Sequence, residues 1–198
     1  MKIVHYTLGL YPQRTGGLNR YATDLMMEQA KKYEVMVITP GPWRPWSKKV
    51  TIKDKGDKGQ LRYYQLYNAL PLPLLYGIKE PHFFVNRDID KRSFEFFIKS
   101  VKPDVLHLHT LMGMPEAALS FFKENGVKIV YTSHDYFGIC PKVNLINQEG
   151  LLCEGPNPYR CAICNMNAPS TLYLRLRNSR LAFVIRDLSR WLKHTLNF

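Results

Sequence analysis

The first forty residues alternate between a strand-like run, a glycine-marked loop, a helical pattern and a second strand-like run. Residues 1–8 are mostly apolar, and the loop after them contains the pair Gly16 and Gly17. From Leu18 onward, apolar residues recur at nearly 3.6-residue spacing, which predicts a helix. Residues 35–39 are rich in β-branched side chains and predict a second strand. Two strands joined by a helix pair in parallel, so this segment predicts a βαβ unit.

The same alternation continues in the middle of the chain. Asp90 is expected to begin a helix that stops at Pro103, and residues 104–109 form the next predicted strand. Residues 115–125 predict a helix, and residues 127–133 predict another strand. Repeated strand–helix alternation indicates an α/β fold with a Rossmann-like, doubly wound parallel sheet.

Three segments depart from this alternation. Residues 40–60 combine prolines, glycines, lysines and two tryptophans, which predicts a basic loop with aromatic side chains at its tip. Residues 138–169 form an excursion rich in proline, glycine and asparagine that carries all the cysteines. Residues 171–196 predict a long amphipathic helix with a basic side. The whole chain, residues 1–198, is predicted to form one domain.

The positive charge of the chain predicts an anionic partner. Lysine and arginine number 28 against 16 acidic residues, which gives a formal charge of +12. Nucleic acid, a phospholipid surface and phosphorylated substrates all fit this charge. The N-terminus has no secretory pattern and no segment approaches about 18 consecutive apolar residues. A cytoplasmic location is therefore expected, with any membrane contact peripheral.

The predicted C-terminal helix has two interpretations. Its apolar side packs on the sheet and leaves a solvated basic side, or it lies on an anionic membrane surface together with Trp43 and Trp46. The apolar side holds Leu174, Leu181, Val184, Ile185, Leu188, Trp191 and Leu192, and the basic side holds Arg175, Arg186, Arg190 and Lys193.

The cysteines are candidate metal ligands, because disulfides are rare in a reducing compartment. A structural zinc would give order to a loop with little apolar content. Free thiols, or an iron–sulfur or redox role, are the alternatives, and no catalytic role is expected because four thiolates close the coordination shell. Cys161 and Cys164 alone have the spacing of a zinc knuckle, and Cys140 and Cys153 complete the set.

Glycines and arginines follow the first predicted strand, where ligands bind in open parallel sheets. A glycine pair that opens a helix lets a phosphate approach the free N–H groups of the helix N-terminus. Gly16 and Gly17 are therefore candidate phosphate-binding residues, although such a pair also occurs in simple turns. Arg14 and Arg20 are either phosphate partners or solvated charges.

Histidines mark the ends of two further strands. His107 and His109 face the same side of one strand, and we expect the first to be packed within the sheet. His109 and His134 each end a strand, so both are expected in one crevice. Asp135 is expected either to orient His134 or to cap the following turn.

Several of these segments, taken in order, resemble one enzyme family. They are residues 16–21 (GGLNRY), 35–39 (VMVIT), 103–109 (PDVLHLH) and 131–135 (YTSHD). Together they resemble the N-terminal domain of the retaining GT-B glycosyltransferases of family four. The cysteine-bearing segments resemble an insertion found in one branch of that family.

The resemblance implies a two-domain enzyme that transfers a sugar, with retention, from a nucleotide-sugar donor to a polysaccharide or lipid-linked acceptor. It implies that Gly16 and Gly17 meet the donor diphosphate and that His134 helps to shape the transition state. The substrate-binding set is expected to include Asn19, Arg20, His109 and Asp135. No catalytic metal is expected. The donor-binding C-terminal domain is expected to be a separate partner, without which the chain has little activity, whether the chain is a cut piece or a natural fragment.

Two other protein classes are compatible with parts of the sequence. A zinc-stabilised nucleic-acid-binding module would use the charge, the aromatic residues and the cysteines. The sequence contains no recognition-helix, finger or RNA-binding signature, so specific nucleic-acid binding is not expected. An NAD-dependent dehydrogenase would need G-x-G-x-x-G in the first loop, where only Gly16 and Gly17 stand.

Overall fold

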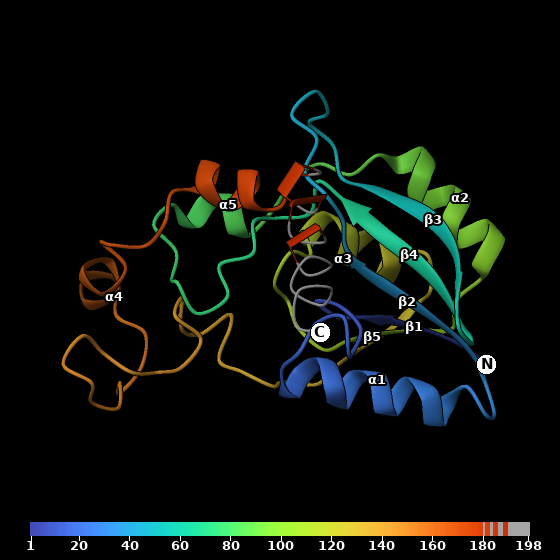
Figure 1. The fold of residues 1–198 in the computed structure, drawn as a ribbon, viewed down its shortest axis with the longest axis horizontal. Helices are drawn as coiled ribbons and strands as arrows, with labels where there is room; N and C mark the ends of the chain where they lie inside the picture. Colours follow the sequence, from blue (N-terminus) through green and yellow to red (C-terminus); the bar gives the residue numbers. More distant parts are fainter. Residues whose placement is uncertain (180, 183, 186–187, 190–198) are drawn as a thin grey trace.

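A computed structural model describes residues 1–179, 181–182, 184–185 and 188–189. Their centre is a six-stranded sheet in the order β3-β4-β2-β1-β5-β6, and Figure 1 shows helices on both of its sides. All neighbouring strands are parallel except β3, which runs antiparallel to β4. The Rossmann-like α/β fold is thus confirmed, with one antiparallel edge strand. The strands are β1 (Lys2–Tyr6), β2 (Glu34–Pro40), β3 (Thr51–Lys58), β4 (Leu61–Tyr67), β5 (Val105–Leu108) and β6 (Lys128–Tyr131).

Apolar residues on alternate sides of the strands bind helices to both faces. Helix α1 (Gly17–Gln29) buries Ala22 and Met26 against one face. Helices α2 (Lys91–Val101) and α3 (Glu116–Glu124) bury Phe94 and Phe122 against the other. Side chains alternate along a strand, so His5 of β1 lies on the α1 side between residues that face α2 and α3. The remaining helices are η1 (Pro81–Phe84), α4 (Pro158–Cys164) and α5 (Thr171–Arg177).

The loop predicted over residues 40–60 is wrong in part, because residues 51–58 form strand β3. Ile52 is the only buried side chain in this strand, and the charged residues after it are mainly exposed. An edge strand needs only one partner and often carries charged side chains. The alternation of apolar and polar residues that identifies a strand is therefore missing here.

The helix predicted over residues 171–196 is interrupted, and this prediction is corrected. Helix α5 ends at Arg177, and the next two residues pair with the loop after β2. The N–H of Trp43 donates to the carbonyl of Asn178 at 2.8 Å, and Trp43 and Ser179 form a β-bridge. Residues 181–182, 184–185 and 188–189 are helical again. Trp191, Leu192, Arg186, Arg190 and Lys193 of that predicted helix lie outside the described residues.

Asparagine side chains give the excursion over residues 138–169 much of its order. Asn157 caps α4 by accepting hydrogen bonds from two backbone N–H groups. Asn165 is almost fully buried, accepts from the N–H of Ile78 at 2.8 Å and donates to the carbonyl of Cys161. Val143 packs in a small apolar cluster below the excursion. The segment therefore has a source of order that its low apolar content did not predict.

Within the described part of the chain, every helix is too short or too polar to span a lipid bilayer.

Candidate active site

The site lies at the carboxyl edge of three adjacent strands, β1, β5 and β6. Pairing continues just past the strand ends, because the N–H of His109 donates to the carbonyl of Tyr6 at 2.9 Å. The N–H of Thr132 donates to the carbonyl of Leu108 at the same distance, two residues before His134. Nδ1 of His109 consequently lies 3.4 Å from Nε2 of His134. The predicted convergence of these two histidines is present in the structure.

A buried row of side chains continues from His134 into the protein. Nε2 of His109 lies 2.9 Å from Nδ1 of His5, and Nε2 of His5 lies 2.8 Å from Oε1 of Gln29 on α1. His5 and His109 are fully buried, whereas His134 and Gln29 are half-buried. We call the row Gln29, His5, His109 and His134 the imidazole chain. His5 and Gln29 were not predicted as site residues, although a histidine within an apolar strand was a signal for the first.

His107 lies beside the imidazole chain but does not form part of it. Its ring centroid is 4.4 Å from that of His109, and its Nε2 lies 2.8 Å from Oγ1 of Thr132. This half-buried position agrees with the predicted packing within the sheet.

Burial keeps the imidazole chain uncharged near neutral pH. Burial, and secondly the neighbouring His107, lower the pKa of His5 to about 4. Burial and the surrounding histidines lower the pKa of His109 to about 3. Burial also lowers the pKa of His134, with Asp135 opposing that change. The rings therefore bond to one another as neutral imidazoles.

The histidine cluster contains a possible set of metal ligands. Among the described residues, the only three His, Cys, Asp or Glu side chains with ligand atoms all within 4.8 Å are His5, His107 and His109. Two nitrogens on one tetrahedral zinc ion, each about 2.0 Å from it, lie about 3.3 Å apart. The 2.9 Å between His5 and His109 is instead the length of a direct hydrogen bond. The geometry therefore fits a hydrogen-bonded chain better than a bound ion.

A glycine turn leads into α1 beside the imidazole chain. Gly16 has φ of 119°, a conformation that favours glycine. A Cβ on Gly17 would meet no atom within 4 Å, so its backbone is open to approach. The first turn of α1 has no acidic residue and no side-chain cap. Its free N–H groups and positive helix end can therefore receive an anion.

The neighbours of the glycine pair have different surroundings. Asn19 is 4% exposed, accepts a hydrogen bond from Thr7 and donates to the carbonyl of Thr15, so it braces the turn. Arg20 is exposed, with Nε 3.7 Å from Asp24 and its guanidinium over the ring of Tyr11. Of these two predicted substrate-binding residues, Arg20 is thus the more accessible.

Asp135 occupies the turn after His134. Its carboxylate accepts from the N–H of Phe137 at 2.9 Å, and the hydroxyl of Ser133 donates to its carbonyl. Of the two roles expected for Asp135, the structure shows the turn-capping one.

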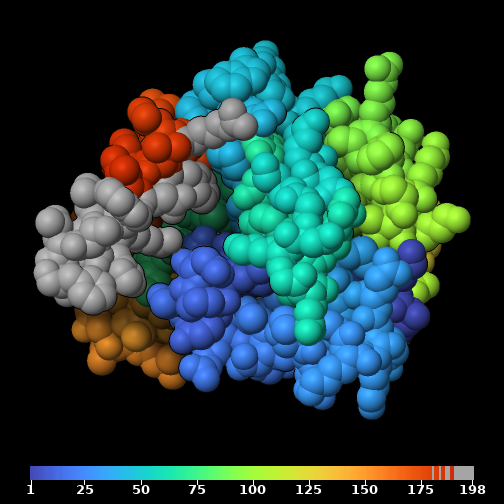
Figure 2. All heavy atoms as spheres, turned by 45° about the vertical axis from the view of Figure 1, so that its right-hand side comes forward, coloured from blue at the N-terminus to red at the C-terminus, as the bar shows by residue number. Residues whose placement is uncertain are grey.

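A hollow of about 540 Å³ opens at the carboxyl edge of β1 and β2. Figure 2 shows the blue segment after β1 and the teal β3–β4 hairpin on either side of it. A larger, shallow hollow of about 820 Å³ adjoins it, shares Arg14 and reaches the glycine turn at Thr15 and Asn19. The residues that give the first hollow its polar and positive lining are Gln13, Arg14, Lys58, Tyr63, Gln65 and Arg177. Except for Arg14, none of these residues was considered as a ligand-binding residue from the sequence.

Close backbone packing holds Arg14 at this hollow. Its Nη1 donates to the carbonyl of Leu8 at 3.0 Å. A Cβ on Gly9 would lie 2.8 Å from side-chain atoms of Arg14, so the arginine can fold over this position only because it is glycine.

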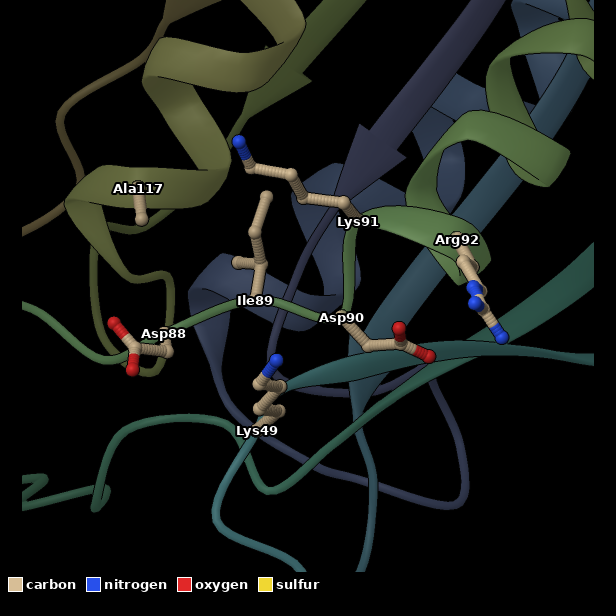
Figure 3. Close-up of a pocket in the computed structure, with 7 residues that line it drawn as sticks. All are labelled: Lys49, Asp88, Ile89, Asp90, Lys91, Arg92 and Ala117. Atoms are coloured by element: carbon tan, nitrogen blue, oxygen red, sulfur yellow. The ribbon is translucent and has the colours of Figure 1, made fainter.

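Another hollow, of about 640 Å³, lies on the side of the sheet covered by α2 and α3 (Figure 3). Lysine and aspartate side chains alternate around it, including Lys49, Asp88, Asp90 and Lys91. It lies across the sheet from the imidazole chain, which faces α1, and therefore forms no part of the same site.

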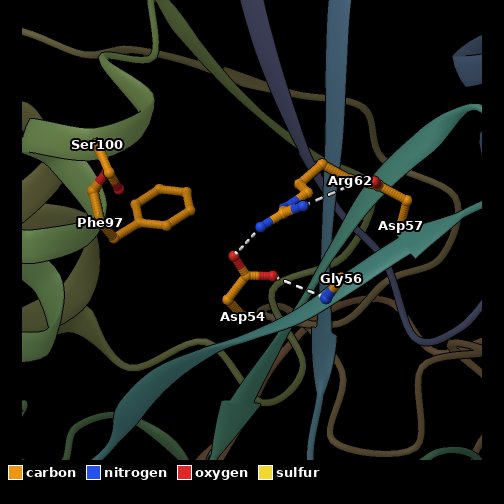
Figure 4. A network of polar contacts seen from close by, with 6 residues as sticks. All are labelled: Asp54, Gly56, Asp57, Arg62, Phe97 and Ser100. Atoms are coloured by element: carbon orange, nitrogen blue, oxygen red, sulfur yellow. Dashed lines mark hydrogen bonds and ion pairs between the residues drawn. The ribbon is translucent and has the colours of Figure 1, made fainter.

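The hairpin that carries Lys58 and Tyr63 to the carboxyl-edge hollow is fixed by ion pairs. Figure 4 shows Arg62 of β4 between two aspartates of β3, at 2.5 Å from Asp54 and 3.2 Å from Asp57. These aspartates lie on either side of a register shift in the β3–β4 pairing. Arg62 therefore holds both parts of the irregular edge strand.

The four cysteines form no disulfide and are half-buried. Cys161 and Cys164 lie one turn apart on α4, and Sγ of Cys153 donates to the carbonyl of Gly155. No three of the four thiols lie within 4.8 Å of one another, all four being described residues. Zinc ligation by this set would therefore require the excursion to rearrange.

The sequence was also compared with known proteins. A search of curated proteins gave no match. The family profile of Glycosyltransferase Family 4 matches residues 15–195. This match covers nearly the whole chain, from the glycine turn past His134, and agrees with the Rossmann-like fold. The chain therefore belongs to glycosyltransferase family 4.

Proposed function

We propose that this domain forms the acceptor side of the cleft in a retaining, nucleotide-sugar-dependent glycosyltransferase. Family membership supports glycosyltransferase activity in general. Within that activity, the glycine turn would meet the donor diphosphate, and His134 would contact the donor sugar. A second, donor-binding domain would form the other side of the cleft.

The observation that carries the proposal is the contact between Tyr21 and His134. Tyr21 stands in the first turns of α1, and its ring packs edge-on against His134 with 4.8 Å between centroids. The N-terminus of α1 and the strand-end histidine thus belong to one surface. A ligand that extends a phosphate to Gly17 would present its adjoining sugar toward His134.

The chemistry proposed for this surface is electrostatic. In a retaining transfer with front-face attack, the leaving diphosphate gains charge as the sugar bond breaks. The uncapped backbone N–H groups in the first turn of α1, beginning with that of Gly17, would stabilise that charge. These dipoles are already oriented and need no reorganisation during the reaction. No enzyme nucleophile and no catalytic metal are required for this step.

The basic hollow is the proposed acceptor site. Lys58 of β3 and Arg177 of α5 line it, and Tyr63 and Gln65 of β4 add polar atoms to its lining. Cations next to hydroxyl and amide groups suit a phosphate-bearing glycan or lipid-linked acceptor.

Steady-state kinetics of the transferase with its donor-binding half test this assignment. Lys58→Gln combined with Arg177→Gln should raise the acceptor KM roughly a hundredfold, since each hydrogen bond to a charged group contributes about 1.5 kcal/mol. The donor KM should not change. Lys53→Gln with Lys55→Gln, in exposed positions of β3 that do not line the hollow, is the matched control. An acceptor KM that moves equally in both double variants would refute the acceptor assignment.

We also propose that the domain contacts an anionic membrane surface through its C-terminal segment. Leu174 is buried, but Leu181 and Leu188 are 69% and 57% exposed, so packing on the sheet does not account for these two apolar side chains. Trp46 is 74% exposed on the loop that Trp43 joins to Asn178. Exposed apolar residues beside the lysines of this loop are typical of a surface that lies on lipid.

A further inference from the structure

The imidazole chain can carry its hydrogen bonds in only two directions. A neutral imidazole has one N–H group and one bare nitrogen. His5 and His109 each use both ring nitrogens, so the donor of one bond determines the donor of the next. In one direction every ring donates through Nε2, and in the other every ring donates through Nδ1.

Gln29 selects between the two directions. Its Oε1 faces Nε2 of His5 at 2.8 Å, and a carbonyl oxygen can only accept. His5 must then carry its proton on Nε2 and accept at Nδ1 from Nε2 of His109. His109 in turn accepts at Nδ1 from Nε2 of His134.

We propose that Gln29, acting through His5 and His109, fixes the tautomer of His134 with its proton on Nε2 and a bare Nδ1. Gln29, His5 and His109 are in this sense positioning residues. Of the three histidines in the imidazole chain, only His134 is accessible to a ligand. Nδ1 of His134 makes no hydrogen bond with any described residue. Within the part of the protein that the structure describes, it is therefore a hydrogen-bond acceptor without a partner.

The tautomer determines what His134 can do in the proposed transferase. A bare Nδ1 accepts a hydrogen bond from a sugar hydroxyl but cannot donate to a phosphate or ring oxygen. This role of Nδ1 deepens the proposed function and rests on it, whereas the tautomer rests on the hydrogen-bond distances and on the Gln29 oxygen that faces His5. A proton added to His5 or His109 would give that ring two N–H groups and reverse the direction of the bonds on its His134 side, so the uncharged state of the buried rings keeps a single direction along the row.

Nitrogen NMR of the histidine side chains tests the proposal on the 198-residue protein without substrate or partner domain. Long-range ¹H–¹⁵N correlation spectra distinguish the protonated from the bare nitrogen of a neutral imidazole by their chemical shifts. Spectra of the ¹⁵N-labelled chain at about pH 8, well above the ordinary histidine pKa, should show protonated Nε2 and bare Nδ1 in His5, His109 and His134. Protonated Nδ1 in His134 would overturn the proposal.

Two substitutions at Gln29 separate positioning from simple packing. Gln29→Glu retains only acceptor oxygens, so it should preserve the tautomer of His134. Gln29→Met has a similar length and no acceptor oxygen, so both nitrogen signals of His134 should shift toward each other as the two tautomers mix. Gln60→Met, at an exposed position in the β3–β4 turn, is the matched control and should leave the spectrum unchanged.

An unaltered His134 tautomer in Gln29→Met would overturn the proposal even if the wild-type tautomer is the expected one. The spectra need no substrate. Their outcome is consequently separate from any failure of the transferase proposal.

Discussion

The ring of Tyr21 on α1 packs edge-on against His134, with 61° between the ring planes. Tyr21 also lies 6.0 Å from His109 between centroids, so one exposed aromatic side chain covers the accessible end of the imidazole chain. We predict that Tyr21→Phe keeps most of the sugar-transfer activity, because the packing is that of the ring. Tyr21→Ala should lower kcat by roughly tenfold, as expected when a contact of about 1.4 kcal/mol that orients His134 is lost. Equal activity of both variants would show that the contact does not orient His134.

Stability should depend on pH through the buried histidines. The pKa of His5 is about 4 and that of His109 about 3 in the folded chain, against 6.5 as the ordinary value. As pH falls below about 6.5, the unfolded chain therefore binds protons that the folded chain does not, and the free energy of unfolding falls. Each histidine contributes a slope of at most about 1.4 kcal/mol per pH unit.

Urea unfolding between about pH 7 and pH 5 measures this slope, above the range where carboxylates titrate. His5→Asn should make the slope shallower, and His82→Asn, an exposed histidine in η1, should leave it unchanged. A slope that His5→Asn does not alter would mean that His5 titrates normally in the folded protein.

Zinc ligation by Cys140, Cys153, Cys161 and Cys164 stays a proposal. It predicts close to one zinc per chain by elemental analysis of protein purified without chelator. Because no three of these thiols are gathered in the structure, zinc should also change the protease sensitivity of residues 138–169. Four freely titrating thiols and no zinc would leave the asparagine hydrogen bonds as the source of order in the excursion.

Membrane contact can be measured by sedimentation with vesicles. The chain should bind anionic vesicles, release as salt rises and bind neutral vesicles weakly. Lys48→Gln with Lys49→Gln should lower the affinity by about 1 kcal/mol per charge, or roughly fivefold each. Lys102→Gln with Lys128→Gln, at the amino end of the strands, is the matched control. Equal losses in both pairs would indicate attraction by net charge rather than by the tryptophan loop.

The sequence predicted the parts of this fold in which periodicity and burial coincide. Strands β1 and β2 and helix α2 have clear apolar patterns, and all are present. Strand β3 was missed because an edge strand with one buried residue has no alternating pattern. The break at Asn178 was missed because it depends on a contact with Trp43, which is distant in the sequence.

The site was also predicted only in part from the sequence. Strand ends identified His109 and His134, since parallel strands bring their carboxyl ends together. Gln29 could not be identified in this way, because it lies at the far end of α1 and reaches the site only by packing on His5. Side chains that meet across elements leave no spacing signal in the chain.

Sugar transfer by a His134→Ala variant tests the central claim most directly. The transferase, assayed with its donor-binding half and a nucleotide sugar, should lose turnover by a factor of about 10² or more, because His134 would act in the transition state. The fold should be intact, and His82→Ala should retain full turnover as the exposed control. Turnover of His134→Ala equal to that of the wild type would contradict the account and make His134 a structural histidine.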